Sequence, residues 1–229
     1  MNKLRRQSNK KILASDLFKR LMKIAETADK KSEITSYHFK SGDEIYKLGK
    51  NARSVFYISQ GLVKLVRLQE TGNESLVRLL SEKEFLGIIS LSRGYQYSSS
   101  AVAVNESKVY RINRDFFMKA LDTDDELSSL LLGYLLQSIY SAETRISELI
   151  TKNVEERIAT ALLSLHFQDR ETKKVTVAKK DLAAIAGTIQ ETISRKLSSM
   201  EKRGLIRLRR KEIILTNLQE LTRMSKVVS

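Results

Sequence analysis

The sequence contains no cysteine, no proline, no tryptophan and only two histidines among its 229 residues. The absence of cysteine excludes disulfides, thiolate metal sites, iron–sulfur clusters and cysteine nucleophiles. With only His38 and His166 present, we expect no metal site built from several histidines. No apolar run reaches about 18 residues, so we expect no membrane span. The charged N-terminus lacks a following apolar stretch of the signal type, so we expect a cytoplasmic location.

Signatures of catalysis are missing as well. We find no paired nucleophile and base, no cluster of metal ligands and no phosphate-binding loop, so we expect neither an enzyme nor a cofactor. Hydrophobic residues make up 41% and charged residues 30% of the chain, a balance typical of a soluble globular protein. The length allows one large domain or two smaller ones, each with its own core.

The net charge of +14 is concentrated at the two ends of the chain. Residues 1–31 hold 10 lysines and arginines against 3 acidic residues, residues 154–229 hold 16 against 9, and residues 32–153 hold 15 of each. Such basic ends indicate a polyanionic partner, most often a nucleic acid. The alternative is that these side chains only keep the protein in solution. We expect residues 1–14 to form a basic tail that is solvated or touches DNA.

Short runs rich in Val, Ile, Tyr and Phe follow a first predicted helix at about residues 15–28. Two of the runs flank Gly72-Asn73, which predicts a hairpin turn between them. Frequent turns between short strands predict a compact antiparallel barrel or roll, and the fold class is therefore α+β, with this domain at residues 15–121. The predicted strands include residues 54–59, 62–68, 75–80 and 107–112.

A long helix is predicted over residues 126–151, because Gly133 alone interrupts the pattern. Its apolar residues step alternately by three and four, which is a heptad pattern. A core helix of the same domain is the alternative. The narrow apolar stripe and a length of roughly 39 Å, at about 1.5 Å per residue, favour a helix that meets its symmetry mate in a dimer. The predicted dimer seam consists of Leu132, Leu135, Ile139, Ala142, Ile146 and Leu149.

Asn153 is predicted to cap the next helix, residues 154–167, whose first turn holds Glu155 and Glu156. The cap marks a junction between a dimerisation helix at residues 122–152 and a C-terminal domain at residues 153–229, and we interpret it as a hinge. His166 is interpreted as an ordinary residue of the last helical turn.

The C-terminal domain holds a short predicted helix that stops at Gly187, a tight turn and a second helix that stops at Gly204. Two strand-like runs follow, at residues 205–210 and 212–217. A short helix, a turn, a second helix and a β-hairpin describe a winged helix-turn-helix, which binds duplex DNA. Four apolar side chains are predicted to hold the second helix against the core: Ile189, Ile193, Leu197 and Met200.

The opposite side of this second helix is predicted to read bases in the major groove. An arginine suits the two acceptors of guanine, and a glutamate can accept from the amino group of cytosine. The alternative is a plain i,i+4 ion pair between Glu191 and Arg195, worth only about 0.3–0.5 kcal/mol. The predicted base-reading residues are Gln190, Glu191, Ser194 and Arg195. The predicted phosphate contacts are Lys179, Lys180, Thr188, Lys196, Arg209, Arg210 and Lys211.

With these features in place, the chain resembles the Crp/Fnr family of bacterial transcription regulators from about residue 15 to its end. The resemblance is carried by residues 42–66, 85–87, 153–165 and, most specifically, 181–206. It implies an N-terminal β-roll of the cyclic-nucleotide-binding type, a central dimerisation helix and a C-terminal winged helix-turn-helix. It also implies a homodimer that binds a palindromic promoter site, with RNA polymerase as a further partner of an activator.

The family's recognition motif falls on Glu191, Ser194 and Arg195 of this sequence. Glu-x-x-Ser-Arg resembles the Fnr-type subset, which implies half-sites related to TTGAT. The residue before the glutamate is often arginine in the family and is Gln190 here. This departure leaves the preference at the outer base open.

The sensor half departs further from the family. Its cyclic-AMP binders carry Gly-Glu after the Phe-x-Gly turn and an Arg-Ser or Arg-Thr pair after the next loop. Here Gly87 is followed by Ile88, and residues 95–101 hold no arginine. A phosphate would lack its guanidinium partner, so we expect no response to cyclic AMP. A loop built around Ser98, Ser99 and Ser100 remains a possible effector pocket with Gly87 and Ile88, and His38 leaves haem open as an alternative.

A second hypothesis belongs to another functional class. The chain could be a ligand-binding sensor that acts through protein contacts, with its basic ends serving solubility alone. Loss of all sequence preference in a selection from random duplexes would favour this alternative.

Overall fold

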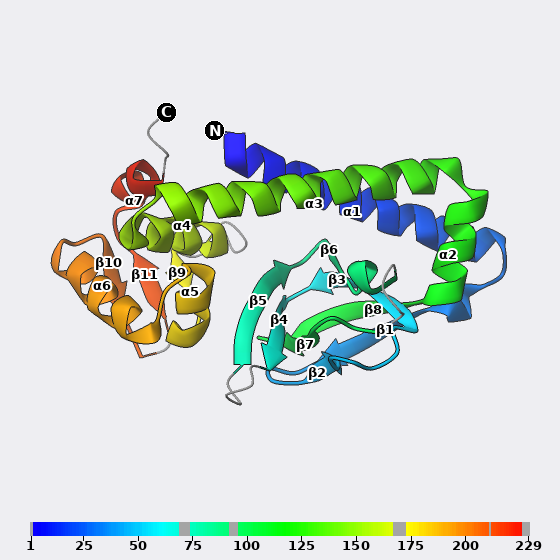
Figure 1. Cartoon of the computed structure of the whole chain (residues 1–229), viewed down its shortest axis with the longest axis horizontal. Coiled ribbons are helices and arrows are strands. Elements are labelled where there is room, and N and C mark those ends of the chain that lie inside the picture. Colours follow the sequence, from blue (N-terminus) through cyan, green and yellow to red (C-terminus); the bar gives the residue numbers. More distant parts are fainter. Residues whose placement is uncertain (1, 69–73, 92–95, 167–172, 211, 226–229) are drawn as a thin grey trace. The chain divides into compact units, whose positions relative to one another are not determined.

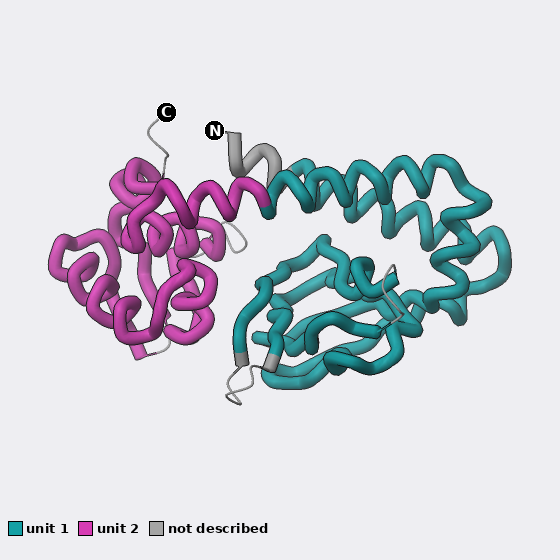
Figure 2. Tube along the Cα trace, viewed as in Figure 1, with its two compact units in different colours: residues 1–142 teal, residues 143–229 magenta. Residues whose placement is uncertain are grey.

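The computed structural model describes residues 2–68, 74–91, 96–166, 173–210 and 212–225 (Figure 1). The chain divides into two compact units, residues 1–142 and 143–229 (Figure 2). The boundary between the units lies inside the longest described helix, α3 (Asp125–Thr151), and the predicted hinge at Asn153 lies further along the chain. The last turns of α3 belong to the second unit, in which Lys152, just after this helix, donates from Nζ to the carbonyl oxygen of Ser225 at 2.6 Å.

Unit 1 contains a β-roll flanked by helices. Its strands form two four-stranded antiparallel sheets, in the orders β1-β8-β3-β6 and β2-β7-β4-β5. All four predicted strands are present, and β4 and β5 form the predicted hairpin, whose turn lies outside the described residues. The strands are β1 (Ile34–Phe39), β2 (Glu44–Tyr46), β3 (Ser54–Gln60), β4 (Leu62–Leu68), β5 (Glu74–Ser81), β6 (Glu84–Leu86), β7 (Ser100–Ala103) and β8 (Ser107–Asn113). The helices are α1 (Asn2–Thr27), η1 (Lys31–Glu33), η2 (Ile88–Leu91), α2 (Arg114–Thr123) and the first part of α3.

Strand β3 explains how the roll is packed, because both of its faces are buried. Phe56 and Ile58 point into the core between the two sheets. Val55 and Tyr57, on the alternate face, pack against α1, α2 and α3. The period of two along a strand therefore gives unit 1 two apolar layers, one inside the roll and one beneath its helices.

Helix α1 begins at Asn2, so residues that we predicted as a basic tail form its first half. Lys10 and Ala14 are buried, and Ala14, Leu17 and Leu21 continue one helical stripe against the unit 1 core. Lys10 escaped the prediction because a lysine in a basic run was taken as solvated. Its Nζ lies 2.5 Å from Oε1 of Glu84, which supplies the counter-charge that burial requires.

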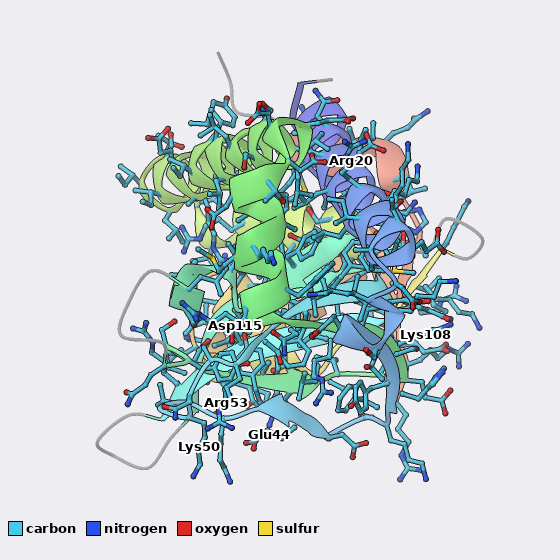
Figure 3. The ribbon with its side chains drawn as sticks, turned by 90° about the vertical axis from the view of Figure 1, so that its right-hand side faces the viewer. Arg20, Glu44, Lys50, Arg53, Lys108 and Asp115 are labelled. Carbon is cyan, nitrogen blue, oxygen red and sulfur yellow. The ribbon has the colours of Figure 1, made fainter. Side chains whose placement is uncertain are left out.

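A second ion pair ties α1 to the start of α3. Arg20, labelled in Figure 3, donates from Nε and Nη2 to the carboxylate of Asp124, at 3.0 and 2.7 Å. The same carboxylate accepts the backbone N–H of Leu127 at 2.7 Å and so caps α3. The Arg20 guanidinium, through these hydrogen bonds, lowers the pKa of Asp124.

Unit 2 is a winged helix-turn-helix, with a short third strand in its sheet and an additional C-terminal helix. Its three-stranded sheet has the order β10-β11-β9. One continuous core joins Ile158 and Leu162 to Leu182 and the buried face of the second motif helix. The elements are α4 (Val154–His166), β9 (Lys174–Val175), α5 (Lys179–Ile185), α6 (Gln190–Lys202), β10 (Ile206–Leu208), β11 (Ile213–Leu215) and α7 (Leu218–Ser225).

The start of α4 confirms Asn153 as a helix cap. Its Oδ1 accepts the backbone N–H groups of Glu155 and Glu156 at 2.9 and 3.1 Å, and the Glu156 carboxylate in turn accepts the backbone N–H of Asn153. This reciprocal arrangement is a capping box. At the other end of α4, His166 is the last residue and is buried.

Candidate nucleic-acid interface

Helix α6 separates its side chains into a buried and an exposed face. Ile193, Leu197 and Met200 are fully buried in the unit 2 core, as predicted. Ile189 was predicted to share this face but is exposed. It stands just before the helix with extended backbone angles, so the helical period does not carry its side chain to the core.

The four predicted base-reading residues lie in the first two turns of α6. Gln190, Glu191 and Arg195 are exposed, and Ser194 is half-buried. The N-cap Ile189 contributes no side-chain hydrogen bond, so the first N–H groups of the helix lack a side-chain cap from that position. Exposed polar side chains beside the positive end of a helix form a surface that can approach a polyanion.

Glu191 and Arg195 form only a marginal ion pair. Their nearest charged atoms, Oε1 and Nη2, are 3.9 Å apart, and the side chains are 75% and 71% exposed. Water screens such a pair, which contributes little to stability. Both groups therefore remain accessible to a partner.

The turn before α6 is set by the end of α5. Gly187 has a φ of +63°, and the N–H of Thr188 donates to Ala183 O at 2.9 Å. The N–H of Gly187 bonds to Ala184 O at 3.3 Å. These two bonds form a Schellman motif, in which glycine adopts the left-handed conformation without strain. The predicted stop of the first motif helix is therefore confirmed.

The predicted phosphate contacts fall into three groups. Lys179 and Lys180 are exposed at the start of α5, and Thr188 is half-buried in the turn. Lys196 differs, because its Nζ lies 3.6 Å from Oε2 of Glu155 and its charge is partly engaged within the protein. Arg209 and Arg210 are exposed after β10, and they share a shallow hollow with Lys174, Glu212 and Ile214. Lys211 lies outside the described residues.

Three further residues of α6 extend the exposed face. Ser198, Ser199 and Lys202 line a shallow hollow together with Ser194 and Arg195. These three residues were not predicted, because the recognition motif ends at Arg195. Positions 194, 198 and 202 follow one another in steps of four, which indicates that they share one face of the helix.

Glu155 connects α4 to this helix. Its side chain, 15% exposed, pairs with Arg203 just after α6 and with Lys196 within α6. It was predicted only as a favourable acid in the first turn of α4. In the structure its two ion pairs also link α4 to α6, in addition to the favourable interaction of the carboxylate with the dipole of α4.

The three serines of the predicted effector pocket form hydrogen bonds with other residues of the β-roll. Ser100 Oγ accepts the N–H of Leu48 at 3.0 Å, and the carbonyl of Ser98 accepts from Arg67 Nε at 2.7 Å. Ser99 is buried and its hydroxyl interacts with Tyr46. The three serines therefore engage different partners of the roll.

Aromatic rings fill the interior next to these serines. Tyr46 stacks on Tyr97 with ring centroids 4.0 Å apart, and the hydroxyl of Tyr97 donates to Ser54 O at 2.9 Å. Burial raises the pKa of both tyrosines, so their hydroxyls stay protonated. The aromatic ring of Tyr97 also lies 3.3 Å from the position that a Cβ on Gly87 would occupy. Side chains of the chain itself thus occupy the space beside Gly87 and Ser99.

The predicted dimer seam is exposed except at one position. Leu135 packs partly against the unit 1 core, because the first part of α3 uses one side to cover the roll. The exposed apolar residues of α3 also include three that the heptad prediction missed, Leu136, Tyr140 and Ile150, of which Ile150 is 79% exposed. The exposed members of the predicted seam are Leu132, Ile139, Ala142, Ile146 and Leu149.

Leu149 has a further contact inside unit 2. Its Cδ2 lies 2.5 Å from the position that a Cβ on Gly187 would occupy, so the leucine packs over the helix-turn-helix turn.

The described residues contain no group of three or more His, Asp or Glu side chains that could hold a metal ion. None of the helices in the described part of the chain is long and apolar enough to cross a membrane.

Comparison with known proteins matches both halves of the chain. The model of the cyclic nucleotide-binding domain matches residues 37–124, and that of the Crp-like helix-turn-helix domain matches residues 156–224. The chain is 25% identical over 200 residues to the "CRP-like cAMP-activated global transcriptional regulator" of Mycobacterium tuberculosis, covering 85% of this chain and 89% of the relative.

Two further relatives agree. The "Fumarate and nitrate reduction regulatory protein" of Vibrio cholerae is 27% identical over 193 residues, covering 81% of this chain and 76% of the relative. The solved structure of TTHA1359, a transcriptional regulator of the CRP/FNR family from Thermus thermophilus, superposes with a TM-score of 0.72 at 26% identity, covering 85% of this chain and all of that one. With the β-roll, the winged helix-turn-helix and both domain models in agreement, the chain belongs to the Crp/Fnr family of DNA-binding transcription regulators.

Proposed function

We propose that the protein acts as a homodimer on a palindromic promoter site with TTGAT-like half-sites, read through Glu191, Ser194 and Arg195. The observation that carries this proposal is the exposed face of α6, on which these side chains lie opposite a fully buried apolar face. Arg195 can donate two hydrogen bonds to a guanine, and Glu191 can accept one from a cytosine. An acidic side chain near phosphates costs electrostatic energy, which base recognition offsets.

The basic residues around α6 supply the affinity that does not depend on sequence. Lys179 and Lys180 precede it, Thr188 lies in the turn, and the exposed arginines after β10 form the wing. Each neutralised phosphate releases counter-ions, so binding weakens as salt rises. In this proposal Lys196 contributes less than the other lysines, because Glu155 already compensates part of its charge.

Dimerisation is proposed to use the exposed apolar residues of α3. Leu132, Leu136, Ile139 and Ile146 leave a large apolar area open to water, which is unfavourable unless another surface covers it. Steps of four, three and seven residues between them follow the heptad repeat of paired helices. The twofold symmetry of such a pair matches the twofold symmetry of a palindrome.

We further propose that DNA binding does not require cyclic AMP. Ile88 follows Gly87 where the family's cyclic-AMP binders carry an acid, and residues 95–101 hold no arginine. Tyr46 and Tyr97 stack on each other near the buried Ser99. A cyclic nucleotide would have to displace this stack without gaining a guanidinium partner for its phosphate. The site of action of a regulator that binds promoters is the cytoplasm, and an activator would also contact RNA polymerase there.

The test is a binding titration with the purified full chain and no added ligand. We expect tighter binding to a duplex of about 30 base pairs that carries a TTGAT palindrome than to a duplex with the same bases scrambled. The affinity should fall steeply as the salt concentration rises. Adding cyclic AMP should change neither affinity. Equal binding to both duplexes at every salt concentration would refute the proposed half-site, and sedimentation of a monomer would refute the proposed dimer.

A further inference from the structure

Arg157, in the first turn of α4, bonds to the C-terminal ends of two other helices. Its Nε donates to Ala186 O at 2.7 Å and its Nη2 to Gly187 O at 3.3 Å, both at the end of α5. Its Nη1 donates to Lys152 O at 2.6 Å and, more weakly, to Leu149 O at 3.5 Å, at the end of α3. One guanidinium therefore joins the last turn of α3 to the last turn of α5.

These carbonyl groups are those that a helix leaves without partners inside its own ladder. The Schellman motif at Gly187 engages the carbonyls of Ala183 and Ala184 but leaves those of Ala186 and Gly187 free. A cation at a helix C-terminus also interacts favourably with the negative end of the helix dipole. Arg157 therefore supplies both hydrogen-bond donors and a positive charge at the C-terminal ends of α3 and α5.

The end of α5 determines where α6 begins. Only Thr188 and Ile189 separate Gly187 from Gln190, the first residue of α6. Leu149 packs over Gly187 from the side of α3, and Arg145 Nη2 lies 3.4 Å from Ala184 O. The last turns of α3 thus contact the turn of the helix-turn-helix through the Arg145 side chain and Leu149, and Arg157 of α4 bonds to both.

We infer that Arg157 is a positioning residue for sequence reading, which fixes the N-terminal turn of α6 relative to the end of α3. The inference rests on the proposed base reading by Glu191, Ser194 and Arg195. Arg157 faces the carbonyls of the protein and acts on DNA only through the position of that turn. A displacement of the turn by a fraction of an ångström would misplace base contacts, while contacts to phosphates, which depend less on direction, would persist.

The geometry requires arginine in particular. The planar guanidinium presents several N–H donors in a fixed fork, so it reaches carbonyls on both sides. A lysine at the same position keeps the charge but places one compact ammonium on a flexible stem. Arg157→Lys therefore preserves the favourable charge at both helix ends and removes the geometric link between them.

The experiment compares full-length wild type, Arg157→Lys and a matched control, Arg207→Lys, whose side chain is exposed on β10. Each protein is titrated with the palindromic and the scrambled duplex at one salt concentration, and its melting temperature is measured. Hydrogen exchange is followed in parallel at residues 186–193, where Thr188 and Ile193 donate backbone bonds. Arg157→Gln provides a second variant without the charge.

For Arg157→Lys we expect about a tenfold lower affinity for the palindrome, which corresponds to about 1.4 kcal/mol, with nearly unchanged binding to the scrambled duplex. Exchange at residues 186–193 should accelerate, and Arg207→Lys should match wild type in exchange. If Arg157→Lys retains the wild-type ratio of affinities and the wild-type exchange, the inference is wrong. It is equally wrong if both affinities fall together with the melting temperature, because that result describes general destabilisation.

Failure of the proposed half-site gives a different result. In that case wild type itself binds the two duplexes equally, whatever residue stands at position 157. The exchange measurement then decides the role of Arg157 alone, since it reports the turn before α6 without any DNA. Unchanged exchange in both Arg157→Lys and Arg157→Gln would overturn the positioning role.

Discussion

Lys10 and Glu84 in unit 1, and Glu191 and Arg195 in unit 2, are both pairs of opposite charge in very different surroundings. The first pair is 2.5 Å apart with side chains only 6% and 12% exposed, while the second is 3.9 Å apart and open to water. Charges that are withdrawn from water require a partner within the protein. Charges that remain in water are free to bind a partner outside it.

The partners of Glu84 show how complete the buried arrangement is. Its carboxylate also accepts the N–H of Ser81 at 2.9 Å and lies 3.3 Å from Arg78, and the Nζ of Lys10 stands 5.3 Å from the ring centroid of Tyr134. The ion pair thus brings together α1, β5 and β6, and the Lys10 ammonium adds a contact with α3. The comparison therefore separates a group used for folding from a group available for recognition, and substitutions in each can test that separation.

The largest effect should come from the buried pair. Glu84→Gln keeps the size of the side chain but leaves the Lys10 ammonium buried without its counter-charge, so we expect a loss of about 3 kcal/mol in the free energy of unfolding. Chemical denaturation followed by circular dichroism measures it. Glu106→Gln, at an exposed glutamate of the same unit, is the control and should leave stability unchanged. A Glu84→Gln variant as stable as the control would show that the pair does not support the fold.

The same residue predicts a dependence on pH. Burial alone would raise the pKa of Glu84, but the charges of Lys10 and Arg78 outweigh it and hold the pKa below its ordinary value of 4.5. The unfolded chain then binds more protons, so this contribution is present above pH 4.5 and is lost as the pH falls through the folded pKa. Glu84→Gln should lose stability less steeply with acid than wild type does. Parallel acid titrations of the two proteins would contradict this assignment.

The second effect concerns recognition, and it should leave folding intact. Arg195→Ala removes an exposed side chain, so the free energy of unfolding should change by less than about 0.5 kcal/mol. Discrimination between the palindrome and a duplex altered at one base pair should fall by roughly 1–3 kcal/mol. Competition titrations against single-base variants measure this, with Lys119→Ala on the exposed side of α2 as the control. Unchanged discrimination in Arg195→Ala would remove this residue from the reading surface.

A smaller effect is expected at the start of α4. Asn153 caps this helix through two backbone N–H groups, so Asn153→Ala should destabilise unit 2 by about 1 kcal/mol. Asn153→Asp is the matched variant, because a carboxylate can accept the same hydrogen bonds and should restore most of the loss. Thermal unfolding of the three proteins tests this order. Equal stabilities of the alanine and asparagine forms would mean that water replaces the cap.

The sequence predicts burial well where local geometry decides it, and poorly where a distant segment does. Periodicity identified the roll strands and the buried face of α6, because Ile193, Leu197 and Met200 repeat with the helical turn and their burial depends only on local geometry. It failed where a distant segment decides the environment. Lys10 is buried only because Glu84, 74 positions along the chain, lies beside it.

The same reason limits the prediction for α3. A heptad pattern identifies apolar positions but cannot tell which of them the roll covers, so the predicted seam included the partly buried Leu135 and left out the exposed Leu136. Arg157 left no local signal either, since its partners are backbone carbonyls of two other helices. Side chains that bond to the backbone of a distant segment leave no pattern of residue types, whereas a local cap such as Asn153 does. Contacts between distant segments therefore account for most of the features that the sequence does not predict.

The smallest effect tests whether Glu191 serves stability or reading. If its only role were the ion pair with Arg195, Glu191→Gln would cost at most about 0.3–0.5 kcal/mol in stability and would not change base preference. We expect instead that Glu191→Gln causes no measurable loss of stability. Its base preference should be relaxed at the base pair where Glu191 accepts a hydrogen bond. A glutamine can still accept that bond, but it can also donate, so it tolerates more than one base. Selection from a library randomised over one half-site, performed with both proteins, distinguishes the two roles, because a stability role predicts identical selected sites.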